Sequence, residues 1–175
     1  MEDECHLLWG DTLGYVWGKR NEKTAIPVLN ERERQTYYGA INCFTGDFYL
    51  LPYDAGNGDN TVDYLKIIQK KLNNKKILII WDGASYHRYS AMKEYLQKIN
   101  KDLPPEEWKI TCELFAPNAP EQNPVEDIWL QGKNYLRKYF TENKTFAQVK
   151  IAFSSFLQNR NFNFPKIQMY RDFIL

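Results

Sequence analysis

Three acidic residues have the type and spacing to bind a divalent metal ion together. Asp82 directly follows the apolar residues 77–81, and open α/β sheets bind their ligands at the carboxyl ends of such strands. Glu126 falls in the first turn of an expected helix. Asp3 comes immediately before the first expected strand, at residues 5–9. If that strand neighbours the one that ends at Asp82, the three carboxylates converge at one edge of the sheet.

Each acid also has a structural interpretation. Asp82 and Gly83 form a dipeptide that is common in turns. Glu126 comes three residues after Asn123, where a glutamate often completes a capping box. For each residue alone, the structural and the catalytic interpretation both stay open. The three acids together favour a metal-binding catalytic site, because clustered carboxylates repel one another unless a cation lies between them. Carboxylate oxygens suit Mg²⁺ or Mn²⁺, and two such ions can activate water to hydrolyse a phosphodiester.

The elements that must position these acids follow from the hydrophobic pattern. Strands are expected at residues 5–9, 36–44, 47–53, 76–81 and 109–115, and helices at residues 61–72, 89–99, 124–140 and 146–158. The expected helix caps are Asn60 or Thr61, Asn123 and Thr145. The order β-β-β-α-β-α-β-α-α predicts an α/β protein with a mixed five-stranded sheet, antiparallel in its first three strands and then parallel, flanked by helices. This is the order of a ribonuclease H-like fold.

The composition favours one domain without a membrane partner. The 175 residues are 43% hydrophobic and 15% aromatic, enough for one sizeable core. The formal charge of +1 gives no global attraction to a polyanion, so any affinity for DNA must come from local patches. Cys5, Cys43 and Cys112 lack disulfide or zinc spacing, so we expect reduced thiols in a cytoplasmic protein. No apolar run is long enough to cross a bilayer.

Five segments carry a family resemblance. They are MEDE at residues 1–4, YVWGKR at 15–20, YGAIN followed by TG within 38–46, IIWDGASYH at 79–87 and APNAPEQNPVEDIW at 116–129. Together they resemble the DDE transposases, in particular the mariner-like branch that includes many bacterial insertion-sequence transposases. The last segment is highly specific, and the resemblance covers most of the chain.

The resemblance implies that Asp3, Asp82 and Glu126 are the catalytic triad of a metal-dependent transposase with two Mg²⁺ or Mn²⁺ ions. Such an enzyme cleaves DNA at the transposon ends and joins the freed 3′-hydroxyl to target DNA. Three departures are visible. The interval between Asp82 and Glu126 is longer than usual in that branch, with the surplus expected in residues 98–108. Gly83 stands where many relatives carry Asn. The N-terminal DNA-binding region is expected to be absent, which leaves residues 1–175 as a single catalytic domain.

Basic residues beside the expected site are candidate DNA contacts. The candidates are Lys19, Arg20, His87, Lys133, Arg137 and Lys138. The first two lie near aromatic residues, and rings can stack on bases while cations neutralise phosphate. The last three lie on the Glu126 helix and can follow a phosphate backbone. The alternatives are a charged hairpin tip, an exposed histidine at a helix start and an ordinary solvated helix face.

The sequence therefore predicts DNA cleavage and strand transfer. Two other interpretations stay open: a ribonuclease H-like nuclease or resolvase that cuts without joining, and an inactive transposase remnant that acts as an interaction module. Besides DNA, a second copy of the chain is an expected partner. A short first strand would leave backbone groups of its neighbours exposed, and self-association would cover them.

Overall fold

A computed structural model of the chain describes residues 1–12, 17–22, 33–84, 87, 89–117, 119–158 and 160–174. The strands are β1 (Glu2–Leu8), β2 (Arg34–Ile41), β3 (Phe48–Tyr53), β4 (Ile77–Trp81) and β5 (Ile110–Leu114). The α-helices are α1 (Gly58–Lys71), α2 (Ser90–Ile99), α3 (Pro124–Lys138), α4 (Phe146–Gln158) and α5 (Pro165–Ile174). Short 3₁₀ helices are η1 (Trp9–Thr12), η3 (Pro105–Glu107) and η4 (Pro120–Gln122).

The strands form two hydrogen-bonded ladders. β1, β2 and β3 are antiparallel in that order, and β4 pairs with β5 in parallel. The expected change from antiparallel to parallel strands is confirmed. The expectation of one five-stranded sheet is not, because no hydrogen-bonded strand pair joins the two ladders within the described part of the chain. β1 nevertheless lies beside β4, which brings the first two acidic segments together.

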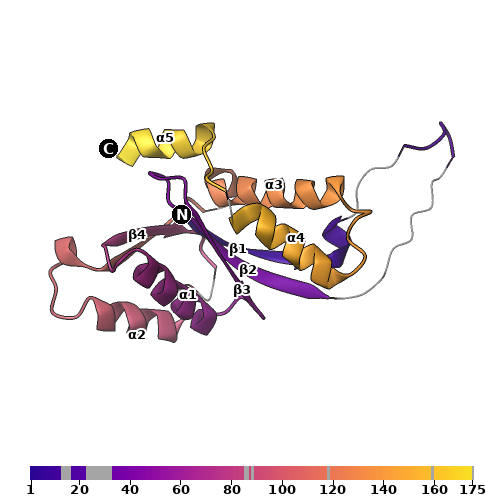
Figure 1. Ribbon diagram of the computed structural model, residues 1–175. Helices are drawn as coiled ribbons and strands as arrows, with labels where there is room; N and C mark the ends of the chain where they lie inside the picture. Colours follow the sequence, from indigo (N-terminus) through magenta and orange to yellow (C-terminus); the bar gives the residue numbers. More distant parts are fainter. Residues whose placement is uncertain are drawn as a thin grey trace.

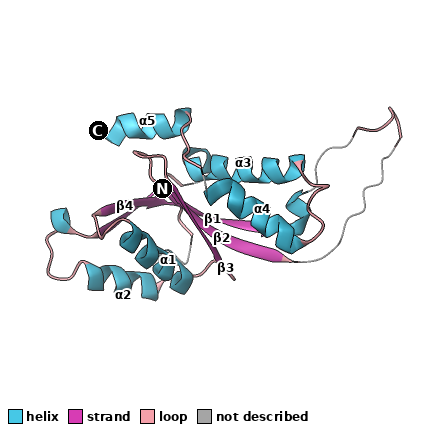
Figure 2. Ribbon diagram, in the orientation of Figure 1, coloured by secondary structure: helices cyan, strands magenta, loops and turns pink. Residues whose placement is uncertain are grey.

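Helices cover both faces of the strands (Figure 1). α3 and α4 lie on one side and α1 and α2 on the other, as the colouring by secondary structure also shows (Figure 2). One core packs α3 and α4 against β1 and β2, and a second packs α1 and α2 against β4 and the other face of β2. None of the described helices has the length and apolar character needed to span a membrane.

β1 begins earlier than the sequence predicted, so Asp3 lies inside the strand rather than before it. Its antiparallel pairing with β2 already includes Glu2 opposite Ala40 and Asp3 opposite Gly39. Acidic residues have low strand propensity, but propensity in strands yields to pairing and burial. The alternation of side chains then places Asp3 on one face of β1 and Glu2 and Glu4 on the other.

Helix starts follow their caps, with one correction. α1 is capped by Asn57, whose side chain accepts from the backbone N–H of Asn60 at 2.9 Å, and not by Asn60 or Thr61. Tyr38 fixes this start, because its hydroxyl donates to the backbone oxygen of Asn57 and accepts from the backbone N–H of the same residue. The caps at Asn123 and Thr145 are confirmed.

α5 was not expected from the sequence. Its apolar pattern is weak, and its position depends on contacts far away in the chain. Lys166 forms an ion pair with Asp127 at 2.5 Å, and the Tyr170 hydroxyl donates to the backbone oxygen of Gln122 at 2.9 Å. These contacts attach α5 to the start of α3, next to the segment that carries Glu126.

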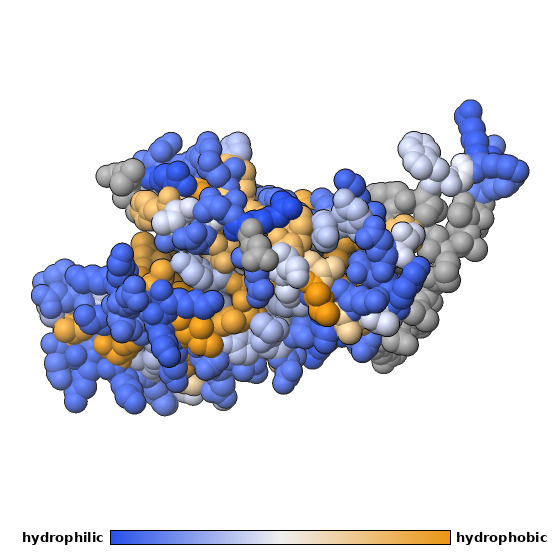
Figure 3. All heavy atoms as spheres, in the orientation of Figure 1, coloured by the Kyte–Doolittle hydropathy of each residue, from blue (hydrophilic) through white to orange (hydrophobic). Residues whose placement is uncertain are grey.

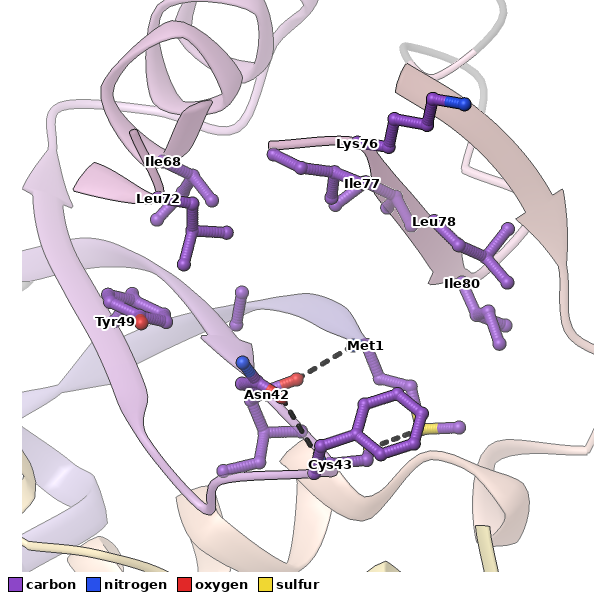
Figure 4. Close-up of a pocket in the computed structure, with 14 residues that line it drawn as sticks. Met1, Asn42, Cys43, Tyr49, Ile68, Leu72, Lys76, Ile77, Leu78 and Ile80 are labelled. Atoms are coloured by element: carbon purple, nitrogen blue, oxygen red, sulfur yellow. Dashed lines mark hydrogen bonds between the residues drawn. The ribbon is translucent and has the colours of Figure 1, made fainter. Parts of the chain in front are cut away.

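An apolar opening of about 210 Å³ separates the two ladders on the side away from the acids. Figure 4 shows Met1 between Asn42, at the end of β2, and Ile80 of β4. Leu78 of β4 is half exposed here. Hydrophobic side chains also appear on the surface over β4 and α1 (Figure 3). The edge of β4 that faces β1 thus has no hydrogen-bonded partner strand among the described residues.

Candidate active site

A cavity of about 520 Å³ gathers all three predicted acids. It is formed where β4 and β5 end, where β1 passes and where α3 begins. Asp3, Asp82 and Glu126 all line it, together with Asn123 and residues 114–117 at and beyond the end of β5. Residues far apart in the sequence therefore share one cavity.

Asp3 is the buried member of the group, with 9% of its surface exposed. The indole Nε1–H of Trp129 donates to its Oδ2 at 3.0 Å. The pKa of Asp3 is raised to about 8, most of all by burial and then by repulsion from Glu126, Glu4 and Asp82, while the Trp129 hydrogen bond opposes the increase. The raised pKa of Asp3 thus reflects the neighbouring carboxylates as well as burial.

Gly39 makes the Trp129 contact possible. It lies opposite Asp3 in the ladder, and a Cβ atom at this position would collide with the rings of Trp129 and Phe48. The missing side chain lets the indole of α3 come close to β2 and reach the Asp3 carboxylate. The glycine of the YGAIN segment therefore has a packing role at the site.

Asp82 is the exposed member that ends β4, with a side chain 56% exposed. Its Oδ1 accepts from the backbone N–H of Ala84 at 2.9 Å, so the turn that the sequence suggested does form. The backbone N–H of Phe115 donates to the backbone oxygen of Trp81 at 2.8 Å and holds the ends of β4 and β5 together. Asp82 can thus both stabilise a turn and line the candidate active site.

Glu126 is exposed in the first turn of α3. The Asn123 side chain caps this helix by accepting from Val125 N–H at 3.1 Å, and its amide nitrogen lies 3.5 Å from the Glu2 backbone oxygen of β1. Among the hydrogen bonds of the described residues, none joins the Glu126 carboxylate to Asn123, so no capping box forms there. The carboxylate lines the cavity instead.

His87 is buried, with a side chain 1% exposed, so the alternative of an exposed helix-start histidine is wrong. Its ring stacks on Trp81 with centroids 4.1 Å apart and planes at 4°. Nδ1 lies 3.0 Å from the Asp82 backbone oxygen and 3.3 Å from Asp82 Oδ1, and Nε2 lies 3.4 Å from Glu4 Oε1. A direct contact of His87 with DNA stays a prediction.

Glu2 and Glu4 are the residues that the sequence interpretation missed. Both lie on the face of β1 opposite Asp3 and point toward His87. Burial raises the pKa of Glu2 well above its ordinary value, and the nearby Glu4, Asp3 and Asp82 carboxylates raise it further. The alternation of acids at residues 2, 3 and 4 was the available signal, because successive strand residues face opposite sides.

The basic candidates lie at increasing distance from the cavity. Lys133, Arg137 and Lys138 follow Glu126 along α3, and a rise of 1.5 Å per residue places them roughly 10–18 Å farther along its axis. Lys138 is exposed, and the other two are partly buried. Lys19 and Arg20 are exposed in the segment 17–22, which Figure 1 shows apart from the helices and strands. Their roles in DNA binding stay predictions.

The fold is shared with solved transposase and intasome structures. A Mos1 transposase paired-end complex with the left transposon end is 12% identical, with a TM-score of 0.61, over 91% of this chain and 47% of that one. The simian T-cell lymphotropic virus intasome in complex with a PP2A regulatory subunit is 13% identical, with a TM-score of 0.53, over 77% and 46%. A Mos1 strand transfer complex is 12% identical, with a TM-score of 0.58, over 98% and 50%.

This likeness shows the class of fold, and the chain spans about half the length of those proteins. No curated protein matches it. Residues 1–147 match the family described as DDE superfamily endonuclease, and the chain belongs to that family. The matched range includes Asp3, Asp82 and Glu126.

Proposed function

We propose that this chain cleaves DNA and transfers the cut strand, with Asp3, Asp82 and Glu126 as catalytic residues and two Mg²⁺ or Mn²⁺ ions as cofactors. The observation that carries the proposal is that β1, the end of β4 and the start of α3 each bring one of these acids into the same cavity. Family membership supports the reaction class. We propose also that residues 1–175 form one ribonuclease H-like catalytic domain, which the proximity of β1 and β4 supports.

The donor set fits the proposed ions. Three carboxylates supply only hard oxygen ligands, as Mg²⁺ and Mn²⁺ prefer. Repulsion from Glu126 and Asp82 contributes to the raised pKa of Asp3, so the site has a surplus of negative charge that a cation would balance. When bound, such ions supply Lewis-acid stabilisation of the phosphate and a lowered pKa for a water nucleophile.

The chain's own residues hold the acids for this work. Trp129 fixes one oxygen of Asp3, and the Ala84 N–H fixes one oxygen of Asp82. Glu126 stays exposed in the cavity, where its carboxylate would hold an ion beside a bound phosphate group. Asp3 holds a proton at neutral pH when no cation is bound, so its deprotonation accompanies formation of the working site.

DNA is the proposed substrate and partner. Two of the similar structures are described as a complex with a transposon end and as a strand transfer complex, and this supports transposon ends and target DNA as the substrates here. Lys19, Arg20 and the basic residues of α3 would contact phosphates away from the cut. A second copy of the chain is a further proposed partner, because the unpaired edge of β4 and the exposed Leu78 leave an apolar opening. Sedimentation of the purified chain measures this association.

A plasmid assay tests the catalytic proposal. Supercoiled plasmid is incubated with the chain and MgCl₂ or MnCl₂, together with a labelled oligonucleotide that has a free 3′-hydroxyl. We expect nicked plasmid and labelled plasmid from the parent chain. Asp82→Asn and Glu126→Gln should lose both products by at least about 10³-fold while keeping the fold, because each removes a charged ligand with little change of shape. Glu121→Gln, at an exposed glutamate in η4 just before α3, is the matched control.

The two products separate the candidate functions. Nicked plasmid without label would favour a nuclease or resolvase. Neither product from a folded parent chain at any metal concentration would favour an inactive remnant. Full activity of Asp82→Asn or Glu126→Gln would remove these acids from the active site.

A further inference from the structure

A second group of ligand-type side chains lies on the other face of β1. Glu2, Glu4 and His87 each direct one potential ligand atom to a common point, and these atoms lie within 4.8 Å of one another. His87 Nε2 is 3.4 Å from Glu4 Oε1 and 3.9 Å from Glu2 Oε2. Metal–ligand bonds of about 2.0–2.2 Å place the ligand atoms of a tetrahedral ion about 3.4 Å apart. The two distances to His87 Nε2 are close to this value, and the widest separation in the group, at most 4.8 Å, would contract by up to about 1.4 Å around an ion.

The burial of Glu2 favours a bound cation. Its side chain is fully buried, and within the described part of the chain neither carboxylate oxygen has a hydrogen-bond partner. A buried carboxylate without hydrogen bonds is costly, because the charge loses its hydration and no hydrogen bond replaces it. Glu4 lies beside it with a side chain only 3% exposed, which adds a second negative group. An ion between them would compensate both.

His87 is oriented as metal-binding histidines usually are. Such residues direct one ring nitrogen to the metal and donate the other ring N–H to a carbonyl or carboxylate. Here Nδ1 faces the backbone oxygen of Asp82 at 3.0 Å, and stacking on Trp81 holds the ring plane. When Nδ1 carries the proton, the lone pair of Nε2 faces Glu2 and Glu4. This contact is independent of the burial of Glu2.

We propose that Glu2, Glu4 and His87 bind a divalent transition-metal ion at a site separate from the Asp3, Asp82 and Glu126 cavity. One imidazole and two carboxylates suit Zn²⁺ or Mn²⁺, and the imidazole makes Mg²⁺ a poor occupant. The ion would be structural, because its ligands are buried. Through His87 it would hold the end of β4 against β1, and so hold Asp82 in place. The proposal goes beyond DNA cleavage and does not depend on it.

Metal binding is measured with ZnCl₂ and MnCl₂ in a Glu126→Gln background, which weakens the proposed catalytic site but has no contact with the second one. We expect that background to keep one tightly bound Zn²⁺ per chain and to melt at a higher temperature with Zn²⁺. Adding Glu2→Gln should reduce Zn²⁺ affinity more than the roughly 10–100-fold typical of an outer-shell change. Adding His87→Gln should do the same. Glu121→Gln and His6→Gln, at exposed positions, should have no effect.

A spectroscopic readout identifies the ligand. The chain has two histidines, so nitrogen coupling to bound Mn²⁺ that persists in His6→Gln and disappears in His87→Gln assigns the imidazole. Circular dichroism checks that each variant is folded, and the nearly isosteric Glu2→Gln keeps the test valid if His87→Gln does not fold. The proposal is overturned if Glu2→Gln binds Zn²⁺ as tightly as its background. A second pair of results also overturns it: Glu2→Gln melts at a higher temperature without metal, and Zn²⁺ does not raise the melting temperature of the Glu126→Gln background. Together they would mean that a proton, and not a metal ion, neutralises the Glu2 carboxylate. Loss of plasmid cleavage with retained Zn²⁺ binding would count against the proposed function alone.

Discussion

At the scale of single residues, the environment separates acids that look equivalent in the sequence. Asp3 is almost fully buried beside Trp129, whereas Asp82 and Glu126 are exposed at the cavity. Burial penalises the charged form of Asp3 and, together with the neighbouring carboxylates, raises its pKa to about 8. Motif spacing identified all three residues but carried no information about this difference.

The raised pKa of Asp3 predicts an unusual pH dependence of stability. In the folded, metal-free chain Asp3 keeps its proton up to about pH 8, whereas the unfolded chain releases it near pH 3.8. Because the folded state binds more protons in this window, the free energy of unfolding falls as pH rises through it. Asp3→Asn should flatten this fall and melt higher than the parent at pH 8. Melting curves in EDTA between pH 5 and pH 8 measure it, and equal slopes for both chains would contradict the assigned pKa.

Stability measurements can show whether Glu126 acts as a metal ligand or as a helix cap. Asn123 caps α3 without it, so Glu126→Ala should change metal-free stability little. The same substitution should remove most of the extra stability that saturating Mn²⁺ gives the parent, because an ion that binds only the folded state stabilises it by mass action. Thermal denaturation with and without Mn²⁺ compares the two, with Glu121→Ala as control. An equal loss of about 1 kcal/mol in both conditions would indicate a cap.

At the scale of elements, local signals predicted more than long-range contacts did. The caps at Asn123 and Thr145 are readable because each cap bonds residues two or three positions ahead. α5 and the early start of β1 were missed, because their positions depend on distant partners such as Asp127 and Ala40. Residues 98–108, where the surplus was expected, include η3 and precede β5, at the end of that strand opposite Leu114 and the cavity. That they hold an insertion stays a prediction.

The packing of α3 on β2 gives an element-scale prediction at Gly39. A methyl group there would meet the Trp129 ring, so Gly39→Ala must push α3 outward or rotate the indole away from Asp3. We expect a loss of about 1–3 kcal/mol of stability, the usual cost of overpacking a core. Plasmid cleavage should fall by more than the unfolded fraction explains. Urea denaturation and the plasmid assay measure the two effects.

Gly10→Ala is the matched control for this prediction, because no atom lies within 4 Å of a Cβ at that position. It should leave both stability and cleavage near the parent values. Unchanged stability of Gly39→Ala would show that the indole is not held in the position described.

At the scale of the whole molecule, the fold brings the acids together, whereas the distribution of positive charge determines how DNA is attracted. The acids converge because two ladders meet at β1 and β4, and this convergence needs no net charge. DNA, however, must be attracted to a chain whose formal charge is only +1. Attraction therefore depends on where the cations lie, and Lys133, Arg137 and Lys138 follow Glu126 along the same helix, α3.

This distribution predicts weak DNA binding without sequence preference and with a strong dependence on salt. Affinity for a duplex oligonucleotide of arbitrary sequence should fall steeply between about 50 and 200 mM salt, because each neutralised phosphate releases counterions. Changing Lys133, Arg137 and Lys138 to Gln should reduce the slope of log affinity against log salt by about 0.9 for each phosphate that is no longer neutralised. The same change at Lys93, Lys98 and Lys101, on and after α2, is the control, since these exposed lysines lie across the sheet from α3. Fluorescence anisotropy gives both slopes. Equal slopes for the two triple variants would place the DNA elsewhere, and tight sequence-selective binding at physiological salt would mean that base recognition dominates over the phosphate neutralisation argued here.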